Sequence, residues 1–197
     1  MSVNSSPARY HAVAIALHWA IALLIAANLA VGFFMEGLPP PQKRLIIGLH
    51  ISSGISVLVL SVVRVCWRLS RPPPAFPVGL RWWEVKLAHA AHFSLYFLMI
   101  AMPVTGWAFL SAHPARPEGG PLIWGLVRWP IMGPISRLSD PFQKHLHDLL
   151  VETHSAGAWI MIALLVLHVG GALKHQLLDR QPELQRMGIG KRQRPLS

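Results

Sequence analysis

The segment Thr153–Leu173, THSAGAWIMIALLVLHVGGAL, decides how this sequence folds. It has 21 consecutive residues without a charged side chain, and about 20 such residues are enough for a helix to cross the hydrocarbon of a membrane. His154 and His168 lie within it, fourteen residues apart. This spacing is almost four helical turns, so both imidazoles project from nearly the same face, about 21 Å apart along the axis. Ionisable side chains inside apolar spans are rare and usually face a bundle interior with a functional role.

Three more uncharged stretches have the length of membrane spans. They are Ala12–Met35, Leu45–Val63 and Leu87–Leu110, with 24, 19 and 24 residues. Only 13% of all residues are charged, against about 25% in soluble domains. We therefore predict an all-α integral membrane protein, a four-helix bundle. We expect the first span to be retained, because its apolar run exceeds the roughly 7–15 residues of a signal-peptide core.

Charge asymmetry predicts the orientation of the bundle. Twelve of the 18 lysines and arginines fall before the first span, between the second and third spans, or after the fourth. Cytoplasmic connections carry the excess of such residues, so both termini are predicted to be cytoplasmic. We expect this basic face, at a pI near 11.1, to meet anionic lipid rather than nucleic acid. Residues 1–178 are predicted to form the membrane domain, and residues 179–197 a basic, mobile cytoplasmic tail.

The connections between spans differ in length. The first contains Pro39-Pro40-Pro41, which predicts a stiff, non-helical turn. The third, about residues 111–147, is long and rich in proline and glycine, with an apolar patch at Leu122–Val127. We expect this loop to lie on the outer membrane surface or to cap the bundle. The fourth helix is predicted to begin before its uncharged stretch, with Pro141 in the first turn.

Orientation fixes the depth of four intramembrane histidines. His18 is expected near the inner end of the first span, level with His168, and His50 near the outer end of the second span, level with His154. Two imidazoles from facing helices can hold a haem iron between them. The alternative for any one histidine is a hydrogen bond to a nearby carbonyl or hydroxyl. The single cysteine, Cys66, excludes a C-x-x-C-H motif for covalent haem attachment. We therefore expect two non-covalent b haems, with these four histidines as the ligands of the irons.

Small residues accompany these histidines in the sequence. Gly54, Gly157 and the pair Gly170-Gly171 lie within four residues of a histidine on the same span. They would allow a flat macrocycle to approach the helix backbone, or they would simply tighten helix packing.

Two further histidines, His89 and His92, lie near the inner end of the third span. Either is an alternative to His18 opposite His168, and we otherwise expect them to contact a propionate or a quinone.

His175, one heptad after His168, is a candidate for moving a proton, although a solvated interfacial histidine has the same sequence signature. Arg64 and Arg68 are candidates for pairing with haem propionates, although inner-side arginines are also what this topology requires.

With these features the chain resembles a known family, the bacterial cytochrome b561 proteins, which are dihaem four-helix cytochromes. The resemblance covers about residues 8–178. It is carried by His18-Trp19, Arg44-Leu45-Ile46, His50-Ile51-Ser52-Ser53-Gly54-Ile55, Arg64, Arg68, Ala88-His89, His92, Tyr96, Pro103, Gly106, His154, His168 and His175. The family's haem ligands correspond to the same four histidines, His18, His50, His154 and His168. The outer loop and the basic tail are longer than the family pattern.

The resemblance implies electron transfer between the membrane quinone pool and a second redox partner. One member type is similar to a superoxide oxidase, which passes electrons from an outer-side donor to quinone, and we expect an oxidoreductase of this kind. Six outer-side cations could steer an anion such as superoxide: Lys43, Arg44, Arg116, Arg128, Arg137 and Lys144. The first alternative is a membrane subunit that serves a partner dehydrogenase or hydrogenase. A transition-metal transporter ranks third, because only Pro103 interrupts a span.

Overall fold

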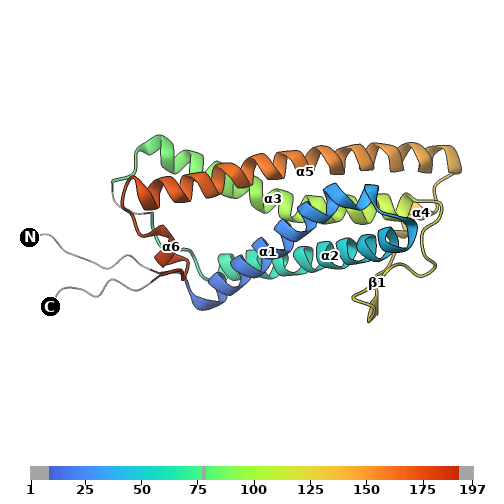
Figure 1. The fold of residues 1–197 in the computed structure, drawn as a ribbon, viewed down its shortest axis with the longest axis horizontal. Coiled ribbons are helices and arrows are strands. Elements are labelled where there is room, and N and C mark those ends of the chain that lie inside the picture. The colour runs from blue at the N-terminus through green and yellow to red at the C-terminus, as the bar shows by residue number, and fades with distance from the viewer. Residues whose placement is uncertain (1–8, 77–78, 191–197) are drawn as a thin grey trace, which may run out of the picture.

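Four long helices dominate the computed structural model, which describes residues 9–76 and 79–190 (Figure 1). They are α1 (Ala12–Phe34), α2 (Pro40–Ser70), α3 (Trp82–Ala112) and α5 (Asp140–Leu177). All four are long and apolar enough to cross a membrane. The predicted four-helix membrane protein is therefore confirmed. We call the end where α1 begins and α5 finishes the α6 end, and the opposite end the hairpin end.

The helices extend beyond their uncharged stretches. Helix α5 begins at Asp140 with Pro141 in its first turn, as predicted. The prediction of a non-helical Pro39–Pro41 turn is wrong, because Pro40 and Pro41 form the first turn of α2. The first helical amides have no intrahelical acceptor, so that proline loses nothing there. A short 3₁₀ turn, η1 (Met35–Gly37), completes the connection from α1.

Neighbouring helices pack in the order α1–α2–α3–α5. Helices α1 and α5, and likewise α2 and α5, are not among the closely packed pairs. The buried core contains seven apolar residues contributed by all four helices: Ile21, Ile25, Val57, Leu95, Leu98, Met99 and Met161. Met161 lies midway between His154 and His168 on α5, so this core separates the two depths at which the histidines lie.

The connection between α3 and α5 runs from residue 113 to 139, shorter than predicted because both helices continue into it. It contains a two-stranded antiparallel hairpin, β1 (Leu122–Ile123) with β2 (Val127–Arg128), and the short helix α4 (Gly133–Ser136). Trp124 at the hairpin turn has a positive φ of 53°. Its backbone N–H and indole N–H donate to Ser52 Oγ and Ser56 Oγ of α2, each at 3.0 Å. The hairpin therefore lies against α2 (Figure 1).

The segment after α5 folds back against the start of α1. It contains α6 (Glu183–Arg186), and Arg186 is buried and donates to the Ala75 carbonyl at 2.7 Å. The Trp19 indole donates to the Met187 carbonyl at 2.9 Å. Residues 183–187 are therefore packed on the bundle. The end of the predicted mobile tail, residues 191–197, lies outside the described residues.

Candidate functional site

The imidazoles of His50 and His154 face each other at the hairpin end. Their ring centroids are 6.2 Å apart, with an angle of 74° between the ring planes. His50 comes from α2 and His154 from α5. The two rings thus face each other across helices that are not closely packed.

His18 of α1 and His168 of α5 face each other near the α6 end. Their ring centroids are also 6.2 Å apart, with an interplanar angle of 68°. His92 lies beside this pair, with its ring centroid 5.4 Å from that of His168. His89 points elsewhere: its Nδ1 lies 2.8 Å from the Val85 carbonyl oxygen. Of the two predicted alternatives to His18, only His92 is therefore in reach of His168.

Both pairs have the dimensions of axial ligands to one iron. Iron–nitrogen bonds of about 2 Å on opposite sides of a metal place two imidazole centroids about 6 Å apart. His50 Nδ1 is also buried without a hydrogen-bond partner among the described residues. Metal ligation requires a deprotonated ring nitrogen, and a site that binds no metal would leave this polar atom unsatisfied. The residues present therefore fit a haem at each pair.

The alternative assignment, an imidazole hydrogen-bonded to a carbonyl or hydroxyl oxygen, also occurs within one of the pairs, because His154 Nδ1 lies 3.1 Å from Thr105 Oγ1. It describes His89, and also His147, whose Nδ1 lies 3.0 Å from the Phe109 carbonyl oxygen. His147 is half-buried, and its ring centroid lies 5.1 Å from that of His113. Partial burial and the neighbouring His147 lower the pKa of His113 below its usual value.

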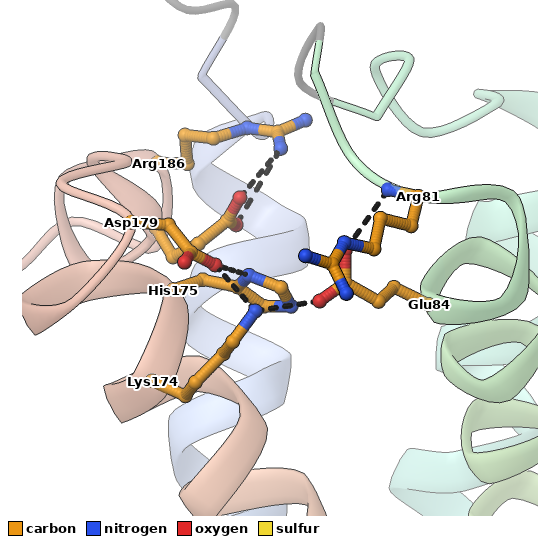
Figure 2. A network of polar contacts seen from close by, with 7 residues as sticks. Arg81, Glu84, Lys174, His175, Asp179 and Arg186 are labelled. Carbon is orange, nitrogen blue, oxygen red and sulfur yellow. Dashed lines mark hydrogen bonds and ion pairs between the residues drawn. The ribbon is translucent and has the colours of Figure 1, made fainter.

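A polar network spans the α6 end between α3 and α5 (Figure 2). Lys174 Nζ lies 2.5 Å from Glu84 Oε1 and 2.7 Å from Asp179 Oδ2, and His175 Nδ1 lies 2.6 Å from the same Asp179 oxygen. The hydrogen bond from Lys174, followed by that from His175, lowers the pKa of Asp179. The network adjoins a cavity of about 630 Å³ that is lined by Arg81 and other polar residues.

This network is an ion-pair cluster rather than a metal centre. Glu84, His175 and Asp179 offer ligand atoms within 4.8 Å of one another. However, the Lys174 ammonium already bonds both carboxylates, so the cationic position among them is taken by a side chain of the protein.

The two arginines predicted near propionates converge on Tyr96 of α3. Arg64 Nε donates to the Tyr96 hydroxyl at 3.1 Å, and its Nη1 donates to the Ala14 carbonyl at 3.3 Å. The Arg68 guanidinium lies 5.5 Å from the centre of the Tyr96 ring. Both guanidiniums therefore lie at the α6 end, where α1, α2 and α3 approach one another.

The glycines near the histidines serve different purposes. A Cβ at Gly157 would collide with Met102 Sδ, and one at Gly54 would lie 3.5 Å from Asn28 Nδ2, so both allow close helix packing. Gly170 and Gly171 have no atom within 4 Å of a Cβ position, which leaves the approach of a macrocycle open there.

Two residues contact His154 in a way that the sequence did not predict: Thr105 was not singled out, and Gly106 was noted only as part of the family resemblance. Thr105 Oγ1 lies 3.1 Å from His154 Nδ1, and a Cβ at Gly106 would lie 3.2 Å from His154 Cε1. The only signal in the sequence was a polar residue next to a glycine in an apolar span, and polar side chains in spans tend to hydrogen-bond across helices. A similar case is Ser53 Oγ, which donates to Asn28 Oδ1 and so joins α2 to α1.

Two facing imidazole pairs in the interior of four membrane-length helices define a class of protein, the helical membrane proteins that hold prosthetic groups between helices. A family model described as prokaryotic cytochrome b561 matches residues 9–190. The chain belongs to this family, and it is a multi-pass, haem-binding electron-transfer protein of the bacterial inner membrane. This agrees with the resemblance seen in the sequence.

Curated relatives cover nearly the whole chain. Cytochrome b561 homolog 2 of Escherichia coli (strain K12) is 30% identical over an alignment of 200 positions, which covers 97% of this chain and 96% of the relative. A protein named "Probable superoxide oxidase CybB" from Yersinia pestis is 28% identical, covering 93% of this chain and 98% of its own length. A protein of Rhodobacter capsulatus named "Probable Ni/Fe-hydrogenase B-type cytochrome subunit" is 24% identical, covering 89% and 77%.

Proposed function

We propose that the chain holds two b haems, one between His18 and His168 and one between His50 and His154, and moves electrons between an outer-side donor and the quinone pool. The observation that carries this proposal is the repeated 6.2 Å spacing of two imidazole pairs, one at each end of the same helix face. One iron between each pair would satisfy all four rings. The membrane domain is residues 1–178.

In the proposed orientation both termini are cytoplasmic, so the hairpin end faces outward. The basis is the charge bias of the sequence, with twelve of 18 lysines and arginines on the cytoplasmic side. The His50–His154 pair is then the outer site and the His18–His168 pair the inner site.

When bound, haem supplies one-electron redox chemistry, and the chain supplies ligation and surroundings. The four histidines would hold the two haems at separate levels, because His154 and His168 lie about 21 Å apart along α5. The apolar core around Met161 lies between the two levels and excludes water from the path. Arg64 and Arg68 remain candidates for neutralising propionates at the inner site, and His92 for a hydrogen bond there.

We place the quinone reaction at the α6 end, beside the inner site. The supporting features are the polar cavity of about 630 Å³ and the adjoining carboxylate, ammonium and imidazole groups. Reduction of a quinone takes up protons, and His175, hydrogen-bonded to Asp179, would hold one at Nδ1.

Superoxide is the donor we favour at the hairpin end. Its support is the name of the Yersinia relative and the cations on this side, which would attract a small anion. Part of this charge is locally compensated, since Lys43 Nζ lies 2.5 Å from Glu36 Oε2. The second candidate, a membrane subunit for a partner dehydrogenase or hydrogenase, is supported by the name of the Rhodobacter relative.

Haem content of four alanine variants tests the ligand assignment. His50→Ala and His154→Ala should each lose the same haem, and His18→Ala and His168→Ala the other, measured by reduced-minus-oxidised optical spectra and haem-to-protein ratio. His145→Ala is the matched control, because this exposed histidine lies on α5 outside both pairs. Loss of a haem in His92→Ala while His18→Ala keeps both would overturn the inner assignment.

Rapid mixing of the anaerobic protein with superoxide and, separately, with quinol tests the donor. Superoxide should reduce the haem within the mixing experiment if it is the donor. Haem that is reduced by quinol but not by superoxide would favour the subunit function instead.

A further inference from the structure

Thr105 of α3 makes two hydrogen bonds through one hydroxyl group. Its Oγ1 lies 2.9 Å from the Met102 carbonyl oxygen of the preceding turn and 3.1 Å from His154 Nδ1 of α5. Helix α3 supplies no member of the His50–His154 pair. The contact therefore joins a third helix to this site.

The chemistry of these groups fixes the direction of both hydrogen bonds. A carbonyl oxygen only accepts, so the single hydroxyl proton of Thr105 is donated to Met102. Toward His154 the Thr105 oxygen can then only accept, which requires a proton on Nδ1. The Met102 backbone also hydrogen-bonds the His154 ring, so Thr105 and the Met102 carbonyl hold this imidazole together. A neutral imidazole with its proton on Nδ1 has an unprotonated Nε2, the atom that is free to bind a metal.

The two histidines of this pair are held differently. His154 is fixed by Thr105 and by Gly106, whose backbone leaves room for the ring. The His50 ring, in contrast, hydrogen-bonds the Asn28 backbone of α1, and its Nδ1 is buried without a hydrogen-bond partner among the described residues. The two rings of this pair are therefore held from different neighbouring helices, α3 and α1.

We propose that Thr105 is a positioning residue that, beside the Met102 carbonyl, holds the tautomer of His154 and lowers the reduction potential of the haem at this pair. The proposal rests on the proposed ligation of haem by His154. A hydrogen bond accepted from the far nitrogen of a ligating imidazole fixes the ring and raises its basicity. A more basic ligand stabilises the oxidised iron, so the potential falls.

Redox titration of the purified holoprotein, followed by optical and electron paramagnetic resonance spectra, tests the role of Thr105. Thr105→Val keeps the shape and removes the acceptor. It should raise one of the two midpoint potentials and leave the other unchanged. Haem affinity at the same site should fall by about 10- to 100-fold, the usual effect of losing such a partner. Thr105→Ser should restore both properties.

Thr153→Val is the matched control. Thr153 precedes His154 on α5, and its hydroxyl also donates to a carbonyl one turn earlier, that of Leu149 at 2.7 Å. It is exposed and is expected to leave both potentials unchanged.

Four outcomes separate the possibilities. A shift confined to the haem that His154→Ala removes, with rescue by serine, supports the role of Thr105. Unchanged potentials in Thr105→Val, or equal shifts of both, would overturn it even if His154→Ala loses a haem. Retention of both haems in His154→Ala would contradict the proposed ligation itself. Selective loss of that haem in Thr105→Val, rescued by serine, also supports the positioning role.

Discussion

Replacing Gly106 should disturb the hairpin-end site through a contact whose size can be read from the structure. An alanine Cβ at this position would lie 3.2 Å from His154 Cε1, short of the 3.4 Å at which ordinary contact begins. The ring must therefore recede by about 0.2 Å, a shift that the Thr105 hydrogen bond resists. A valine adds two methyl groups beyond this Cβ, and the ring would have to leave its position.

We expect Gly106→Ala to keep both haems with an altered low-spin resonance signal from one of them. Gly106→Val should lose that haem alone, as measured by haem-to-protein ratio and by which midpoint potential disappears. Helix propensity acts in the opposite direction, since alanine favours a helix over glycine by about 1 kcal/mol. A loss of haem would thus come from the histidine contact and not from a weaker helix.

Gly48→Ala and Gly48→Val are the controls. Gly48 lies in α2, two residues before His50, and has no atom within 4 Å of its Cβ position. Both variants should keep both haems. The reasoning is refuted if Gly106→Val keeps two haems with unchanged spectra, or if Gly48→Val loses the same haem.

Three further expectations concern other parts of the chain. Asp179→Asn should flatten the loss of stability at acid pH. The pKa of Asp179 is lowered from 3.8, so its contribution to stability is complete above about pH 4 and is lost as the pH falls through the lowered value. Thermal unfolding between about pH 3 and pH 7 measures this, and a profile parallel to that of the unmodified protein would contradict it. Gly157→Ala should lower the free energy of unfolding by about 1–3 kcal/mol through its collision with Met102. The double variant with Met102→Ala should lose less stability than the sum of the two single variants. Strict additivity, measured by unfolding in detergent, would argue against the collision. Leu126 is 82% exposed on the hairpin, and an exposed apolar patch of a membrane protein belongs in lipid. A spin label at this position, in a Cys66→Ser background, should therefore be more accessible to apolar oxygen than to a water-soluble nickel chelate. The opposite order would place the hairpin in water.

The spans and the depth of each histidine could be predicted because both depend on one coordinate, position along the membrane normal. Uncharged length gives each span, and charge bias gives its direction. Uncharged length alone would begin the fourth helix at Thr153, and Pro141 gave the separate signal that the helix begins earlier, near Asp140. Beyond the hydrocarbon, charged side chains are solvated and no longer interrupt a helix.

Lateral neighbours could not be predicted in the same way. His92 and His18 share a depth, and only the packing of α1, α3 and α5 shows that both rings lie near His168. Thr105 was missed for the same reason, since its contact with His154 depends on the rotation of α3 about its own axis. Apolar and polar residues of α3 are not segregated to opposite faces, so the sequence carries little mark of that rotation.

The apolar core between the two histidine levels has an electrical consequence. Because it contains no charge and little polarity, the membrane voltage falls largely across it. Moving one charge across the full membrane changes its energy by about 2.3 kcal/mol per 100 mV. An electron that travels about 21 Å of a hydrocarbon layer about 30 Å thick would therefore feel about 1.6 kcal/mol per 100 mV. In the proposed orientation, inward electron flow runs against a membrane potential that is negative inside. The distribution of electrons between the two levels would then report how strongly the cell is energised.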